Sequence, residues 1–177
     1  MTLIDNFSRK IWVYFMKEKS EVFTRFKIWK AKVEKEQGRS LKCLRSDNDG
    51  EYTSREFQVF CEECGIKRHF IVKGTPQQNG VVERMNRTLM EKARCMRLQA
   101  GLPKVFWIDT VDAACYLVNR SPHTWLDGGL PEETWSGRQI GLSHVKVFGC
   151  TAYVHVGAGG RSKLDARSKK MIFLGYP

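Results

Sequence analysis

Two carboxylates in this sequence have the residue types and the spacing for metal chemistry. Asp47 directly follows a short apolar run at 41–46, and Glu83 lies near the start of a segment with helical periodicity. The residues between them are positions 48–82, a spacing of 35. Hard cations such as Mg²⁺ and Mn²⁺ take carboxylate oxygens brought in from different elements. Two such ions, about 4 Å apart, activate a hydroxyl nucleophile and stabilise a leaving oxyanion at a phosphodiester. We therefore interpret the pair as part of a divalent-metal site acting on DNA.

A plainer interpretation is open for both residues. Asp47 would bond its own backbone in a turn, and Glu83 would be a solvated carboxylate favoured by the positive end of its helix. The surroundings favour the metal site, because Arg84 and Arg87 lie beside Glu83 on the same predicted helix. Cations in this position would hold DNA phosphates near the metals.

The polar segment before that helix is the other half of the candidate DNA surface. Residues 73–80, KGTPQQNG, predict a loop, followed by a helix from about 81 to 100. In an alternative, TPQQ at 75–78 forms a capping box and starts the helix earlier. Amide and ammonium groups bond to bases and phosphates. The side chains expected to contact DNA here are Lys73, Gln77, Gln78 and Asn79.

The overall charge agrees with a polyanionic partner. The chain has 30 Lys and Arg against 19 Asp and Glu, a net charge of +11 and a pI near 9.5. The basic residues are spread along the sequence, which favours a folded positive surface over a disordered basic tail. The longest apolar run, Ile11 to Met16, is far too short to span a bilayer, so we expect no membrane partner.

The cysteines fit neither a disulfide framework nor a complete zinc site. Six cysteines in 177 residues are too sparse for a disulfide scaffold, which indicates free and mostly buried thiols. Cys61 and Cys64 with His69 begin like a zinc knuckle, but the position for the fourth ligand is Gly74. Both cysteines fall on the apolar face of a predicted helix, so we interpret them as core residues.

The periodicity predicts an α/β layer arrangement with a mixed sheet. A strand hairpin opens the chain and is followed by an amphipathic helix at 20–37, a strand at 41–46, a helix capped by Thr53 or Ser54, a strand at 66–72, the long helix, and a helix from Pro103 to Val118. We predict three parts: a core at 1–122, a loop-rich linker at 123–139 and a small β module at 140–177, with strands within 144–156 and 170–176.

Several longer motifs together resemble one known family, the integrase of copia-type LTR retrotransposons, over nearly the whole chain. They are LRSDNDGEY, TPQQNGVVERMNRTLMEKAR, GLPKVFW, YLVNRSP, HVKVFGCTAYVHV and RSKLDARSKKMIFLGY. The resemblance implies an RNase H-like core with an Asp, Asp, Glu metal triad, in which Asp47 matches the second Asp and Glu83 the Glu. The 35-residue spacing agrees with the retroviral integrase pattern. The tail from about 140 would be the SH3-like β region found after the copia core.

The resemblance also implies an activity and its partners. The intact family trims the 3' ends of element DNA and joins them to target DNA, with Mg²⁺ or Mn²⁺ as cofactor. The partners would be element ends, target DNA and further copies of the chain, and the location would be nuclear after passage through the cytoplasm. Two alternatives stay open: a catalytically dead DNA-binding or oligomerising domain, and an RNase H-type nuclease, which would lack the PQQNGVVER loop and helix.

Some positions depart from the family pattern. The first triad Asp of the family lies upstream of TLIDNFSR, and the amino-terminal zinc domain is also absent from this sequence. Asp5 matches a position near a strand end that is not the triad Asp. Asp49 stands where the family usually has Gly, and Lys73-Gly74 where it often has Pro-Tyr. These departures fit a fragment or a decayed copy of a transposon, and we expect an integrase core that lacks its first strand.

A joining assay tests the importance of the upstream Asp. We expect the 177-residue chain alone to show little strand transfer with Mn²⁺, because losing one of three carboxylates weakens the hold on both ions. Robust joining of a labelled DNA end to a plasmid by this chain would contradict the expectation.

Overall fold

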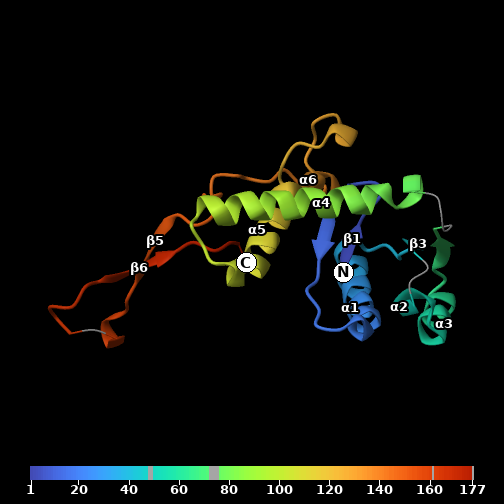
Figure 1. The fold of residues 1–177 in the computed structure, drawn as a ribbon, viewed down its shortest axis with the longest axis horizontal. Helices are drawn as coiled ribbons and strands as arrows, with labels where there is room; N and C mark the ends of the chain where they lie inside the picture. Colours follow the sequence, from blue (N-terminus) through green and yellow to red (C-terminus); the bar gives the residue numbers. More distant parts are fainter. Residues whose placement is uncertain (48–49, 72–75, 161, 177) are drawn as a thin grey trace. The chain divides into compact units, whose positions relative to one another are not determined.

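The computed structural model describes residues 1–47, 50–71, 76–160 and 162–176, with 76–79 and 158 described by their backbone alone. Figure 1 shows the order of helices and strands along the chain. Two compact units are present. The first consists of Met1–Ile4 and Ile11–Asn86, and the second of Asp5–Lys10 and Arg87–Pro177. The candidate carboxylates Asp47 and Glu83 both belong to the first unit.

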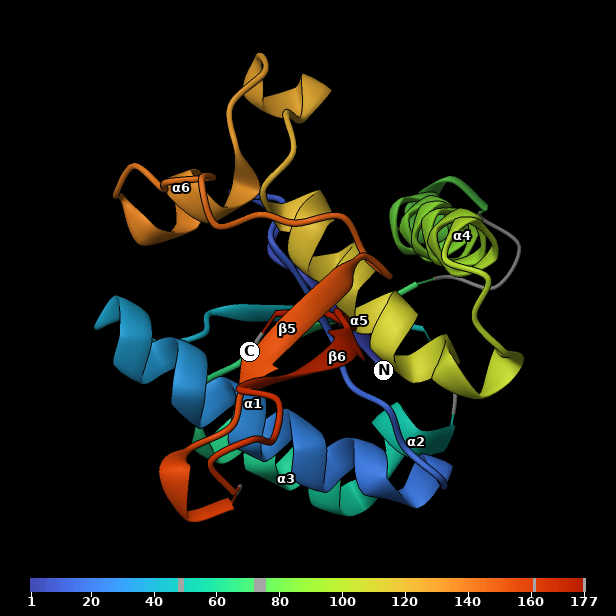
Figure 2. The same ribbon diagram turned by 90° about the vertical axis from the view of Figure 1, so that its left-hand side faces the viewer.

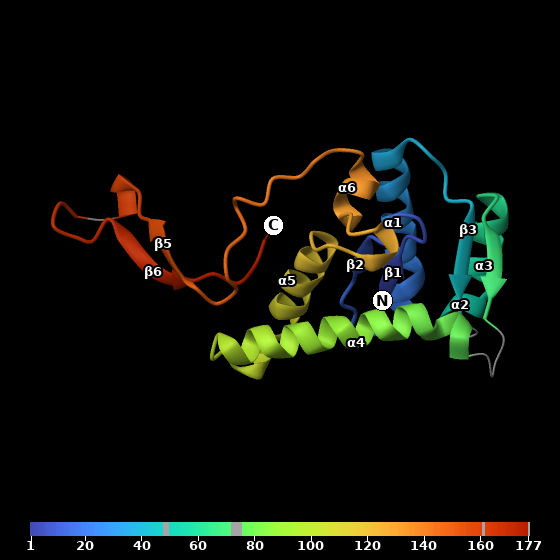
Figure 3. The same ribbon diagram turned by 90° about the horizontal axis from the view of Figure 1, so that it is seen from above.

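The strands of the first unit form an antiparallel pair and a parallel pair. β1 (Thr2–Ile4) and β2 (Ile11–Val13) make the predicted hairpin. β3 (Cys43–Ser46) and β4 (Lys67–Phe70) run parallel (Figure 3, where β4 is the green arrow beside β3). Both strand directions of the predicted mixed sheet are therefore present. In the described residues, each pair is hydrogen-bonded as its own two-stranded ladder.

Two helices of the first unit have boundaries close to the predicted ones. After a 3₁₀ turn, η1 (Lys19–Glu21), α1 (Val22–Gln37) ends at Gly38, whose φ of 61° suits a residue without a Cβ. α3 (Arg55–Glu63) is capped by Ser54, whose hydroxyl accepts a hydrogen bond from the Phe57 amide at 3.3 Å. The short α2 (Gly50–Thr53) was not predicted, because four residues carry no apolar periodicity.

Aromatic packing between α1 and α3, whose ribbons appear in Figure 2, holds the first unit together. Phe26 and Phe57 are fully buried, with ring centroids 4.9 Å apart. Phe23 packs on Phe57 at 5.2 Å and Trp29 packs on Phe26 at 5.7 Å. Cys61 is also fully buried, as its place on the apolar face of the helix predicts. Because α3 lies between β3 and β4 in sequence, this packing fixes the crossover that parallel strands require.

The long helix begins earlier than the main prediction. α4 runs Pro76–Gln99, so the prediction of a loop through residue 80 is wrong and the early-start alternative is confirmed. Proline suits the first helical position, because its missing N–H would have no helical partner there and its φ is already helical. Gly80 inside the helix costs only about 1 kcal/mol. Although α4 is long, none of the helices in the described ranges combines the length and apolarity needed to cross a membrane.

The second unit contains further helices around a small apolar cluster. Its elements are η2 (Lys104–Phe106), α5 (Trp107–Asn119), η3 (Thr124–Leu126) and α6 (Pro131–Ser136). Pro103 precedes η2 instead of entering the helix, and the segment predicted as loop-rich contains α6. Leu102, Ala113 and Phe148 form the cluster.

A two-stranded ribbon lies near the end of the second unit. β5 (Thr151–His155) and β6 (Ser168–Ile172) pair antiparallel, with η4 (Ala158–Gly160) between them. β5 lies within the predicted 144–156, whereas β6 begins two residues before the predicted 170–176 and ends at 172. Tyr176 stacks on Tyr116 of α5 with ring centroids 4.0 Å apart, which fixes the segment after β6. The boundaries predicted at 122 and 139 stay a prediction.

The buried aromatic cluster gives a stability prediction. We expect Phe26→Ala to lower the free energy of unfolding by about 3–5 kcal/mol, because the ring is 0% exposed and its loss leaves a cavity. Ile28→Ala on the same helix is the matched control, since Ile28 is 55% exposed and should change stability by roughly 0.5 kcal/mol or less. Urea denaturation followed by circular dichroism measures both. Equal losses would contradict the assignment of the core.

Candidate nucleic-acid and metal site

Asp47 lies where the parallel strands end. It directly follows Ser46, the last residue of β3, and is half-buried. The ladder continues one step past β4, because the Ile71 amide donates to the Ser46 carbonyl at 3.0 Å. The carboxyl ends of β3 and β4 are thus at the same edge. Ligands and catalytic groups collect at this edge in α/β sheets, so the predicted place of Asp47 at a strand end is confirmed.

Glu83 lies in the second turn of α4 and is exposed. α4 begins shortly after the end of β4, with only residues 71–75 between them. Glu83 therefore follows, in chain order, the strand that pairs with the one preceding Asp47. Throughout the described ranges, its carboxylate forms no ion pair with Lys, Arg or His. None of the cations in the described ranges therefore neutralises this carboxylate.

Two arginines follow Glu83 on α4. Arg84 and Arg87 are both exposed on α4. The Arg84 guanidinium carbon lies 3.9 Å from where a Cβ at Gly80 would be, so this side chain extends back along the helix toward its amino end. Because backbone N–H groups at that end are also electropositive, this part of α4 favours phosphate.

Other expected DNA contacts lie partly or wholly outside the described residues. Lys73 is outside them. Gln77, Gln78 and Asn79 lie in the first turn of α4, and their side chains are outside the described part. Their roles stay predictions.

The residues fit a divalent cation as part of a ligand set. Asp47 and Glu83 offer the hard oxygens that Mg²⁺ and Mn²⁺ prefer. Among the described residues there is no group of three His, Cys, Asp or Glu side chains that could hold a metal ion. Asp49, close to Asp47 in sequence, lies outside the described residues. The structure thus provides candidate ligands and not a complete site.

Asp5 has a structural role in the turn that follows β1. Its Oδ2 accepts hydrogen bonds from the Ser8 amide at 2.7 Å and the Ser8 hydroxyl at 2.8 Å. The Arg9 amide donates to the Asp5 carbonyl at 3.0 Å. These bonds close the turn between β1 and β2, and the carboxylate is used within it.

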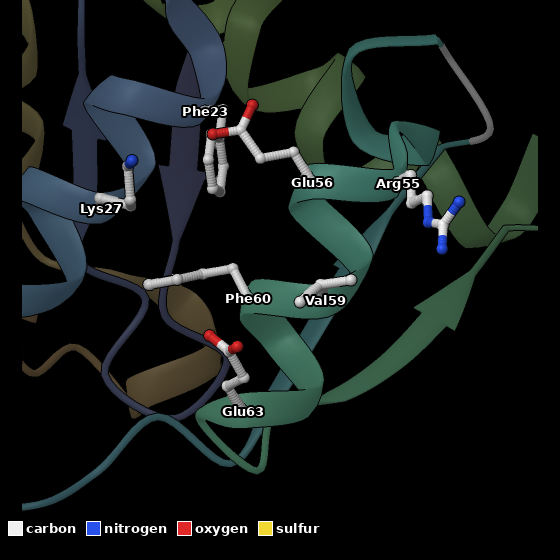
Figure 4. A pocket seen from close by; sticks show the side chains of 7 residues that line it. All are labelled: Phe23, Lys27, Arg55, Glu56, Val59, Phe60 and Glu63. Carbon is white, nitrogen blue, oxygen red and sulfur yellow. The ribbon is translucent and has the colours of Figure 1, made fainter.

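A cavity of about 470 Å³ lies between α1 and α3 in the first unit. Figure 4 shows Phe23 and Lys27 from α1 and the remaining lining side chains from α3. None of the predicted site residues lines it. The cavity therefore does not belong to the candidate metal site.

Family models match the chain over the regions just described. Two models, each described as "Integrase core domain", match residues 1–76 and 64–106 and together cover more than half of the chain. A third, "Retroviral polymerase SH3-like domain", matches residues 150–177, which include the β5–β6 ribbon. The chain belongs to the integrase core family, whose members carry out DNA integration.

The relatives are polyproteins of transposable elements. The chain is 53% identical over 176 residues to the retrovirus-related Pol polyprotein from transposon TNT 1-94 of Nicotiana tabacum. That match covers 99% of this chain and 13% of the polyprotein. The resemblance to a retrotransposon integrase is confirmed, while the chain spans about an eighth of the length of this relative.

Solved structures with the same fold are retroviral integrases. A chain of the simian T-cell lymphotropic virus intasome in complex with PP2A regulatory subunit B56 gamma matches with a TM-score of 0.61 and 20% identity, covering 97% of this chain and 60% of that one. The HTLV-2 integrase catalytic core domain in complex with magnesium, in a trimeric form, matches with a TM-score of 0.56 and 22% identity, covering 74% and 80%. The predicted RNase H-like fold with an SH3-like region is confirmed.

One residue near the site was missed by the sequence reasoning. Arg68 lies on β4 within KRHF, and the sequence pattern alone does not distinguish it from the other basic residues of this strand. The period-2 alternation of a strand would have placed it on the same face as Phe70, toward the covering helix. Only the register with β3 shows that this face also carries Ser46, next to Asp47.

The arginines of α4 give a prediction about DNA affinity. Replacing Arg84 and Arg87 together by Ala should reduce the slope of log affinity against log salt by about 2, because each removes roughly one phosphate contact. The control replaces Lys32 and Lys35, an exposed pair with the same spacing on α1. Fluorescence anisotropy with duplex DNA without divalent metal measures the slopes. An unchanged slope in the Arg84 and Arg87 variant would contradict a DNA contact by this face of α4.

Proposed function

We propose that this chain is the catalytic core region of a retrotransposon integrase that trims the 3' ends of element DNA and joins them to target DNA. The support is the placement of Asp47 at the end of β3 and of Glu83 on α4, in a chain that belongs to the integrase core family. The HTLV-2 core among its structural neighbours was solved with magnesium. Asp47 and Glu83 would be two ligands of Mg²⁺ or Mn²⁺.

The two proposed steps use one kind of chemistry at phosphorus. In trimming, a water oxygen attacks a phosphodiester near the 3' end of the element, and the bond from phosphorus to the departing 3' oxygen breaks. In joining, the freed 3'-hydroxyl oxygen attacks a target phosphodiester, and a new P–O bond replaces the one that breaks. Bound divalent cations supply nucleophile activation and charge neutralisation at the leaving oxygen.

The chain's own residues have binding and orienting roles in this proposal. Asp47 and Glu83 neutralise and place the cations. Arg84 and Arg87 hold phosphates beside Glu83, since guanidinium groups bond phosphate oxygens in a fixed geometry. Lys73, Gln77, Gln78 and Asn79 contact the DNA ahead of them. DNA ends, target DNA and further copies of the chain are the proposed partners, and the nucleus is the proposed site of action.

A joining assay separates the proposed enzyme from a remnant that only binds DNA. The protein is prepared together with any coding sequence that precedes Met1 in its gene, and the joining of a labelled duplex end to plasmid is measured with Mg²⁺ or Mn²⁺. We expect Asp47→Asn and Glu83→Gln each to reduce joining roughly a hundredfold or more, because each removes a metal ligand.

The control for the joining assay is Glu91→Gln, an exposed carboxylate farther along α4, which should stay within roughly twofold of the unchanged protein. Joining that survives Asp47→Asn would sink the assignment of the site. DNA binding without any metal-dependent joining would favour the catalytically dead alternative.

A further inference from the structure

Arg68 is placed by the β3–β4 register beside the residue that carries Asp47. Arg68 pairs with Leu44 across the parallel ladder, and Phe70 pairs with Ser46. Leu44 and Ser46 are buried while Phe70 is 45% exposed, so this face of the two strands is covered on the β3 side. Since side chains two residues apart share a face, Arg68 points to the side where α3 packs.

The Arg68 side chain connects several elements of the first unit. Its guanidinium carbon lies 4.7 Å from the ring centroid of Phe57 and 4.6 Å from that of Phe70. Its Nη2 donates to the Ser46 hydroxyl at 3.2 Å and to the Tyr52 carbonyl at 2.8 Å. A planar cation held by two rings is fixed in orientation, so the directions of these hydrogen bonds are fixed too.

The two acceptors lie on either side of Asp47 in the sequence. Ser46 directly precedes Asp47, and Tyr52 belongs to α2, which follows it. We propose that Arg68 is a positioning residue, whose guanidinium holds the Ser46 hydroxyl before Asp47 and the Tyr52 carbonyl after it and thereby orients this carboxylate toward a divalent cation. This inference rests on the proposed metal role of Asp47 and deepens it.

The surroundings of Arg68 fit a positioning role better than an ordinary ion pair. Within the described part of the chain it forms no ion pair with a carboxylate, and its buried Nε has no hydrogen-bond partner. Nη1 lies 3.8 Å from the Cys61 sulfur, and burial raises the pKa of that thiol, so no thiolate neutralises the cation. Burying a cation without a counter-charge costs free energy of folding. The hydrogen bonds of Arg68 on either side of Asp47 are consistent with a functional reason for keeping this cation.

Paramagnetic NMR on the 177-residue chain tests the inference. Mn²⁺ is titrated into ¹⁵N-labelled protein, and the concentration that half-broadens the amide signals of Asp47 and Glu83 is measured. We expect Arg68→Met to raise this concentration about tenfold, as loss of a residue that orients a metal ligand does. Arg68→Lys keeps the charge and loses the planar guanidinium. This variant should raise the half-broadening Mn²⁺ concentration by a smaller factor, about threefold.

Lys67→Met is the matched control, because it removes the same charge from the neighbouring residue of β4, which is exposed. Lys67→Met should leave the half-broadening Mn²⁺ concentration unchanged. Hydrogen exchange should rise in Arg68→Met at the amides of Ser46 and Asp47 while that of Phe26 in the core stays slow. DNA affinity in the absence of metal should not change, since the arginines of α4 are untouched.

The outcomes separate this inference from the proposed function. The Mn²⁺ concentration that half-broadens Asp47 and Glu83 could be the same in the unchanged chain, in Arg68→Met and in Arg68→Lys. That result would overturn the positioning role and leave the metal site unaffected. No selective broadening of Asp47 and Glu83 in the unchanged chain would overturn the metal site, and the positioning role with it. If Arg68→Met loses the fold, Arg68→Lys decides: a Mn²⁺ concentration equal to that of the unchanged chain overturns the role.

Discussion

The parallel pairing of β3 with β4 is the constraint on which the candidate site depends. Parallel strands cannot be joined by a tight turn, so the chain between them must cross over and cover one face of the pair. α2 and α3 make that crossover, and the packing of Phe57 against Phe26 of α1 holds it in place. As a result β3 and β4 end at one edge, which carries Asp47 and from which the chain continues into α4.

This arrangement makes a polar site depend on an apolar core. Phe57 contacts both the fully buried Phe26 and the guanidinium of Arg68, so the aromatic cluster and the hydrogen bonds beside Asp47 share a residue. Arg68 in turn bonds Ser46 and Tyr52. Arg68 thus connects the α1–α3 packing to the end of β3 by direct contacts. Exposed cations on α4 have no such connection, because a phosphate contact needs charge and reach more than fixed geometry.

Sequence periodicity predicted the elements that bury a full apolar stripe. The spacing of Val22, Phe26, Trp29 and Val33 gave α1, and the cap at Ser54 gave the start of α3. The helix start at Pro76 was harder to predict, because PQQNG is polar and contains a glycine, so that propensity alone favours a loop. Asp47 and Glu83 were found because carboxylates at a strand end and near a helix start are local features. The role of Arg68 depends on a strand register between residues 24 apart in sequence, Leu44 and Arg68, which no local pattern contains.

Under the proposed function, affinity for DNA and chemistry on DNA depend on different side chains. A net charge of +11 from basic residues spread over the sequence supplies attraction to phosphate that is screened by salt and tolerates single losses. Phosphoryl transfer depends on a few carboxylates placed to within fractions of an ångström, and each one removed leaves the chain more positive. A copy that loses a triad carboxylate would thus bind DNA at least as well as before while losing its chemistry. Under the proposed function, DNA binding alone would follow from the charge, whereas a working integrase core would be marked by metal-dependent joining that is lost in Asp47→Asn and Glu83→Gln.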